Sequence, residues 1–131
     1  MIPEKGESMH ALIVDDSRAM RRILRQIVEP FGFQITEAGN GREALQRLDD
    51  NPETELVLVD WNMPEMDGLE FVRVVRANPL YERIKLVMVT TETEPAKMAR
   101  ALMAGVDEFV MKPFTPEILI DKLRLIGVAT G

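Results

Sequence analysis

The chain has 131 residues and a formal net charge of -6, and 46% of its residues are apolar. This length fits one domain with a sizeable core, and the negative charge disfavours binding to nucleic acid. The sequence contains no cysteine, which excludes disulfides and thiolate chemistry and fits a reducing compartment. No stretch approaches the roughly 18 apolar residues that suggest a membrane span. We therefore expect a soluble, cytoplasmic monomer.

The first predicted strand, Ala11–Val14, is an apolar run that is followed directly by two aspartates. Ser17 is a good N-cap for the helix that comes next, and Pro30 and Gly32 end that helix. Apolar residues recur along the helix at three-and-four spacing, which predicts one buried face. Arginines have the same spacing on the opposite face, at Arg18, Arg21, Arg22 and Arg25.

The rest of the chain repeats this alternation of strand and helix. Four further strands are predicted at 33–38, Leu56–Val59, Leu86–Val89 and Phe109–Met111. Further helices are predicted at Arg42–Leu48, at Leu69–Arg76, from an N-cap at Thr93 to Gly105, and from an N-cap at Thr115 onwards. This pattern favours a doubly wound α/β domain whose parallel sheet is covered on both faces. We expect residues 1–9 to be a flexible tail and residues 10–131 to form the domain.

Polar side chains follow the predicted strands where each strand ends: Asp15, Asp16, Asp60, Thr90 and Lys112. In open α/β sheets the carboxyl ends of the strands meet at one edge, where ligands bind. Carboxylates gathered there repel one another and need positive charge among them. Lys112 supplies one charge, and a small hard dication held by oxygen ligands, such as Mg²⁺, would supply the rest. This combination suits attack of Asp60 on a phosphorus atom, which gives an aspartyl phosphate.

Four motifs, "VDDS", "LVDWNMPEMDG", "VMVTT" and "EFVMKPFT", occur in the order and with the separations of a known family. Over nearly its whole length the chain resembles response-regulator receiver domains, particularly the single-domain chemotaxis regulators of the CheY type. The resemblance implies a flavodoxin-like sheet of five strands in the order 2-1-3-4-5 with five helices. It implies a protein that a histidine kinase phosphorylates and that signals by a conformational switch. Such a protein acts on itself, through phosphotransfer and autodephosphorylation, and is no enzyme for a separate substrate.

The resemblance also assigns roles to the residues of the site. Asp60 would be the phosphoacceptor, and Asp15, Asp16, Asp60 and the backbone carbonyl of Asn62 would hold Mg²⁺. Lys112 would contact the phosphoryl group, and a cis peptide is expected before the proline that follows it.

Other positions match residues that tune and transmit the signal in the family. Thr90 and Phe109 would form the switch, whereas Asn62 and Glu92 would tune dephosphorylation. The partners implied are a histidine kinase or phosphotransfer protein, a phosphatase, and a target on the face made by the fourth helix, fifth strand and fifth helix. The arginine face of the first helix resembles a kinase-docking surface and equally fits a solvated face.

The sequence leaves several alternative functions and targets open. A flagellar motor switch is one candidate target, but Glu94 and Pro95 stand where motor-binding relatives tend to carry lysines, so a phosphate sink or relay intermediate is an alternative. A Mg²⁺-dependent phosphatase with an aspartate nucleophile would need an acid or base at position 62, and Asn62 cannot transfer a proton. A nucleotide- or flavin-binding module would need a glycine-rich phosphate loop, which the sequence lacks.

Overall fold

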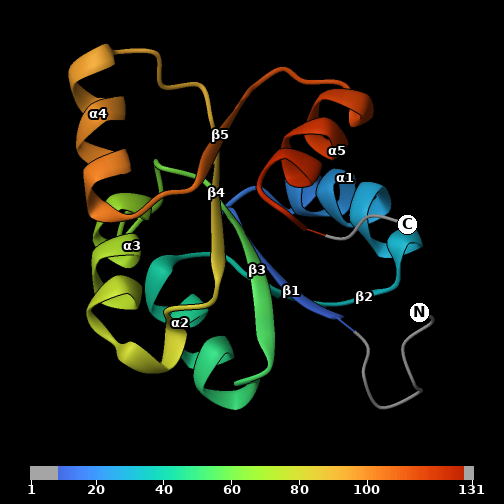
Figure 1. The fold of residues 1–131 in the computed structure, drawn as a ribbon, viewed down its shortest axis with the longest axis horizontal. Helices are drawn as coiled ribbons and strands as arrows, with labels where there is room; N and C mark the ends of the chain where they lie inside the picture. Colours follow the sequence, from blue (N-terminus) through green and yellow to red (C-terminus); the bar gives the residue numbers. More distant parts are fainter. Residues whose placement is uncertain (1–8, 129–131) are drawn as a thin grey trace.

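The computed structural model describes residues 9–128, which form one parallel sheet with helices on both faces (Figure 1). The strands of the sheet are β1 (Met9–Val14), β2 (Phe33–Ala38), β3 (Thr54–Val59), β4 (Lys85–Thr90) and β5 (Glu108–Met111). The α-helices are α1 (Arg18–Val28), α2 (Gly41–Asp50), α3 (Gly68–Ala77), α4 (Pro95–Ala104) and α5 (Pro116–Leu125), with short 3₁₀ helices η1 (Glu29–Phe31) and η2 (Pro79–Tyr81). The strand order is β2-β1-β3-β4-β5, which confirms the order that the family resemblance implies. Within the described residues, no helix has the length and hydropathy that crossing a membrane requires.

The sheet separates two hydrophobic clusters because successive side chains of each strand point to opposite faces. In β3, for example, Val57 and Val59 pack into the cluster that α2, α3 and α4 cover, whereas Leu56 and Leu58 pack into the cluster under α1 and α5. Figure 1 shows the two groups of helices on opposite sides of the sheet. This double burial explains why the central strands read as continuous apolar runs.

The first strand begins earlier than the sequence predicts. Residues 1–8 of the predicted tail lie outside the described residues, but Met9 and His10 belong to β1, where they pair with Phe33 and Gln34 of β2. Both side chains are only partly buried. The strand continues here because the backbone of β2 supplies hydrogen bonds, a cause that apolar patterning does not reveal.

Helix caps explain most of the other boundaries. Ser17 and Thr115 cap α1 and α5 through their side chains, and Gly105 ends α4 with φ 119, as predicted. The predicted N-cap at Thr93 is wrong, because Glu94 occupies that position and makes no side-chain capping bond. The helix α4 is also lightly anchored: among its described residues only Ala101 is fully buried.

Candidate functional site

The predicted site residues converge at the carboxyl edge of the sheet. The strand ladders continue past the strand ends, since the amide of Asp60 donates to the carbonyl of Val14 at 2.9 Å and that of Lys112 donates to the carbonyl of Thr90 at 2.9 Å. These bonds fix each residue relative to the neighbouring strand. The peptide bond after Lys112 is cis, as the resemblance implied. Residues up to 97 positions apart in the chain are therefore in direct contact.

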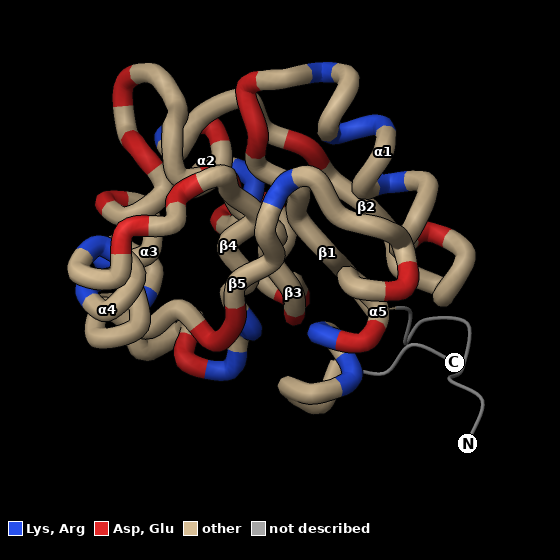
Figure 2. The backbone as a smooth tube through the Cα atoms, turned by 90° about the horizontal axis from the view of Figure 1, so that it is seen from above, with Lys and Arg blue, Asp and Glu red and all other residues tan. Residues whose placement is uncertain are grey.

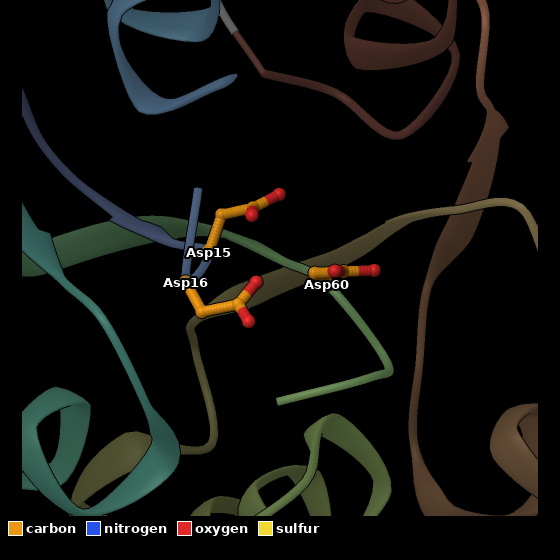
Figure 3. Close-up of side chains that lie close together, drawn as sticks. All are labelled: Asp15, Asp16 and Asp60. Carbon is orange, nitrogen blue, oxygen red and sulfur yellow. The ribbon is translucent and has the colours of Figure 1, made fainter. Parts of the chain in front are cut away.

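Three carboxylates lie together at this edge, those of Asp15, Asp16 and Asp60 (Figure 3). Each offers one oxygen, and these oxygens all lie within 4.8 Å of one another. Asp15 and Asp60 are buried, whereas Asp16 is exposed. The group consists of hard oxygen donors without histidine, which fits a divalent ion such as Mg²⁺ better than a zinc ion.

Among the described residues, Lys112 is the cation that pairs with two of these carboxylates. Its Nζ lies 2.9 Å from Oδ2 of Asp15 and 3.6 Å from Oδ2 of Asp60. Burial raises the pKa of Asp60, and the charge of Asp15 raises it further, whereas Lys112 and the backbone amide of Trp61 oppose that shift. One lysine thus compensates the gathered negative charge only in part, so the site has a remaining attraction for cations.

Backbone amides orient the two buried carboxylates. The amide of Trp61 donates to Oδ1 of Asp60 at 2.8 Å, and the amide of Ser17 donates to Oδ1 of Asp15 at 2.9 Å. In both residues the second oxygen, Oδ2, is the one that lies near Lys112. Asp60 therefore presents one fixed oxygen and one oxygen that faces the cation.

Gly68 closes the loop that follows Asp60. Its amide donates to the carbonyl of Trp61 at 2.8 Å, and a Cβ atom at this position would collide with the carbonyl oxygen of Asp60. Only glycine permits this approach of backbone to backbone. Gly68 thereby fixes the end of β3, a role that the sequence analysis did not assign because the close approach exists only in the folded chain.

Thr90 and Glu92 form a connected unit beside the site. Thr90 is completely buried, and its Oγ1 accepts the amide of Glu92 at 3.2 Å. The carboxylate of Glu92 accepts the amides of Thr93 and Glu94 at 3.1 and 3.0 Å and lies 3.4 Å from Nζ of Lys97. The backbone amide of Glu94 is the main cause that lowers the pKa of Glu92, with Lys97 adding to it. Glu92 thus fixes the loop that leads into α4, although it does not cap the first turn of the helix itself.

The two other residues for which tuning and switch roles are predicted differ in exposure. Asn62 is exposed in the loop after Asp60, whereas Phe109 is 7% exposed and packs in the hydrophobic cluster under α2, α3 and α4.

The arginine face of α1 divides into two kinds of residue (Figure 2, blue along α1). Arg21 and Arg25 form ion pairs with Glu37 of β2 at 2.9 and 2.8 Å, whereas Arg18 and Arg22 are exposed. Burial opposes ionisation of Glu37, but the hydrogen bonds and charges of Arg25 and Arg21 outweigh it and lower the pKa of this residue. Two of the four arginines of the predicted docking face therefore form ion pairs within the domain.

Comparison with known proteins identifies similar chains over nearly the whole length. Residues 11–124 match the family described as response regulator receiver domain. The chain is 44% identical to chemotaxis protein CheY1 of Helicobacter pylori, over 90% of this chain and 96% of that protein. It is also 44% identical to a CheY homolog of Campylobacter jejuni, over 94% and 96% of the two chains. The structure of the chemotaxis response regulator CheY4 of Vibrio cholerae superimposes with a TM-score of 0.84 at 34% identity, covering 91% of this chain and 98% of that one.

Proposed function

Because this chain belongs to the response regulator receiver family, as a CheY-like chemotaxis response regulator, we propose that it signals by accepting a phosphoryl group on Asp60. Membership of this family makes it a signalling protein that modifies itself, rather than an enzyme for a separate substrate. It also favours this function over the phosphatase and the nucleotide-binding module that the sequence left open. A histidine kinase is the implied partner.

The geometry of Asp60 is the observation that carries the proposal. Its Oδ1 is held by the amide of Trp61, and its Oδ2 faces Lys112 at 3.6 Å. In the proposed reaction Oδ2 attacks the phosphorus atom of a phosphohistidine, the new O–P bond forms, and the P–N bond to the imidazole breaks. The imidazole nitrogen leaves with the electron pair of that bond.

The residues around Asp60 would then stabilise the transferred group. Asp15, Asp16, Asp60 and the carbonyl of Asn62 would hold Mg²⁺, which when bound offsets charge on the phosphoryl oxygens. Lys112 would exchange part of its contact with Asp15 for a phosphoryl oxygen.

Thr90 is proposed to connect the modification to the rest of the domain. Its hydroxyl accepts the amide of Glu92 in this structure, and it would turn to donate to a phosphoryl oxygen. Phe109 would respond through the hydrophobic cluster in which it packs. Phosphorylation would shift the population towards this second arrangement, because the phosphoryl group interacts more favourably with it than with the first.

The target would bind the face made by α4, β5 and α5. The flagellar motor switch is one candidate target, and the alternative is that the protein acts as a phosphate sink or relay intermediate. Asn62 and Glu92 would tune the lifetime of the phosphoryl group. A separate phosphatase that acts on this group is a further candidate partner. For Glu92 this role requires its carboxylate to leave the amides of Thr93 and Glu94 and the ammonium of Lys97.

The test is labelling with a small phosphodonor and Mg²⁺, followed by intact mass spectrometry. The wild-type protein should gain one phosphoryl group, and Asp60→Asn should gain none. Asp49→Asn, at an exposed position in the last turn of α2, is the matched control and should be labelled like the wild type. Labelling of Asp60→Asn to the wild-type level would refute the assignment of the phosphoacceptor.

A further inference from the structure

The loop that follows Asp60 is fastened at two separate places. We call residues 61–67 the β3–α3 loop and residues 38–41 the β2–α2 corner. The first fastening is the bond from Gly68 to Trp61 at the neck of the loop. The second joins the far side of the loop to the β2–α2 corner. Asn62, whose carbonyl the proposed function assigns to the metal, lies between the two fastenings.

Two hydrogen bonds and a close packing contact make the second fastening. The amide of Gly41 donates to the carbonyl of Met66 at 3.2 Å, and Nδ2 of Asn40 donates to Oε2 of Glu65 at 3.1 Å. Met66 lies so near Gly41 that a Cβ atom there would be 2.7 Å from its Cγ and 2.8 Å from its carbonyl oxygen. Gly41 and Met66 therefore pack so closely that one methyl group added at Gly41 would displace Met66.

The backbone of the loop is held in an unfavourable conformation at this contact. Glu65 has φ 65 and is the one non-glycine residue in the described part of the chain with a positive φ. Such a conformation persists where the surroundings impose it. Here the bond from Asn40 and the contact of the next residue, Met66, with Gly41 are the surroundings that do so.

The same corner also holds the other side of the acidic site. The amide of Asp15 donates to the carbonyl of Ala38 at 3.1 Å, two residues before Asn40. The β2–α2 corner thus contacts both segments that carry the proposed metal ligands, although it contributes no ligand itself.

We propose that the β2–α2 corner positions the metal site, with Asn40 and Gly41 as the positioning residues. They fix the path of the β3–α3 loop and with it the place of the Asn62 carbonyl relative to Asp15 and Asp60. The inference rests on the proposed function, because it concerns affinity for the Mg²⁺ ion that the function requires. Residues that orient metal ligands from outside typically change affinity by about 10- to 100-fold when they are replaced.

Asn40 offers a variant that separates positioning from helix stability. Its Oδ1 accepts the amide of Glu43 at 2.9 Å and caps α2, whereas its Nδ2 makes the bond to Glu65. Serine is an equally good N-cap but carries no amide donor for Glu65. Asn40→Ser should therefore keep α2 intact and weaken Mg²⁺ binding by about tenfold.

The glycines of the corner supply a matched pair. Gly41→Ala should displace Met66 and weaken Mg²⁺ binding by about tenfold or more. Gly39→Ala is the control, because a Cβ there would have its nearest neighbour, Nη1 of Arg21, at 3.8 Å, an ordinary contact. Its Mg²⁺ affinity should stay within about twofold of the wild type, since it disturbs none of the bonds from Asn40 or Gly41.

A second pair tests the contact from the loop side, in case Gly41→Ala does not fold. Glu65→Ala removes the acceptor and should weaken binding like Asn40→Ser. Glu65→Gln removes the same charge but keeps an oxygen acceptor for Asn40, so it should retain most of the wild-type affinity.

The measurement is an NMR titration of backbone amides with MgCl₂ on the full chain, with urea unfolding of each variant in parallel. If the wild type binds Mg²⁺ and both Asn40→Ser and Glu65→Ala bind it equally well, the positioning role is overturned and the proposed function stands. An affinity loss in Gly39→Ala as large as in Gly41→Ala would also overturn it. If the wild type binds no Mg²⁺, the proposed function fails, and this inference fails with it.

Discussion

Removing the charge of Asp60 should stabilise the protein when no metal is bound. The change is Asp60→Asn, which keeps the shape of the side chain and an oxygen that can accept the amide of Trp61. In the wild type, the buried carboxylate of Asp60 lies close to Asp15 and Asp16, and among the described residues only Lys112 forms an ion pair with it. The substitution relieves both the repulsion and the cost of burying the charge.

The distances give the size of the effect. Two unit charges about 4 Å apart interact by about 4 kcal/mol at an effective dielectric constant of about 20. Asp15 and Asp16 oppose ionised Asp60 with oxygens within 4.8 Å, and Lys112 favours it from 3.6 Å. Because Asp16 is exposed, solvent screens its share of the repulsion. The attraction to Lys112 therefore cancels most of the repulsion, and the cost of burying the charge decides the sign. Relief of that cost should make the asparagine variant more stable by about 1–2 kcal/mol.

The gain in stability of Asp60→Asn over the wild type must depend on pH in a defined direction. The pKa of Asp60 is raised above its ordinary value of 3.8. A raised carboxyl pKa means that the folded state binds the proton more tightly than the unfolded state does. The stability contributed by protonated Asp60 is therefore fully present below pH 3.8 and is lost as the pH rises through the raised pKa. Asp60→Asn should exceed the wild type in stability most at pH 7, and the difference should shrink on acidification.

Urea unfolding in EDTA, at pH 7 and at a series of lower pH values, measures this difference. The control Asp49→Asn should change the unfolding free energy by less than about 0.5 kcal/mol. Adding Mg²⁺ should narrow or reverse the difference, because the wild type gains the binding free energy. An Asp60→Asn variant that is no more stable than the wild type at pH 7 in EDTA would contradict the electrostatic account of the site.

Three further substitutions have defined outcomes. Lys112→Met removes the cation nearest to Asp60, so the rate of phosphodonor labelling should fall by about 100-fold or more, and an undiminished rate would exclude its role. Gly68→Ala introduces a Cβ against the carbonyl of Asp60 and should lower the unfolding free energy in urea by about 2–4 kcal/mol. Thr90→Ala should still be labelled, but hydrogen exchange at residues 91–98 should no longer differ between the phosphorylated and free forms; a retained difference would show that Thr90 is not the link.

The position of the site could be predicted from the sequence because the strand pattern is strong. Each central strand is an apolar run, and a polar residue stands directly after it, as Asp60 does after Val59. Parallel strands place those residues at one edge whatever the details of the helices. For this reason the convergence of Asp15, Asp60 and Lys112 follows from local pattern and topology together.

Features that depend on contacts between distant segments could not be predicted. Sequence spacing placed Arg21 and Arg22 on one exposed face of α1, but Glu37 on β2 lies beside only the first of them and binds it. A similar limit applies to Glu92, whose carboxylate caps the loop before α4, because its bonds depend on the path of that loop. The close approach of Gly41 to Met66 likewise arises from two loops that meet only in the folded chain.

The light anchoring of α4 affects how the domain fluctuates. Lifting α4 from the sheet would uncover the methyl group of Ala101 together with partly buried Met98 and Ala104. Lifting α3 would uncover four larger buried side chains, Leu69, Phe71, Val72 and Val75. Detachment of α4 therefore has a much smaller hydrophobic penalty. Its amide protons should exchange with solvent through partial opening long before those of α3, so spontaneous motion concentrates in this helix even when nothing is bound to the domain.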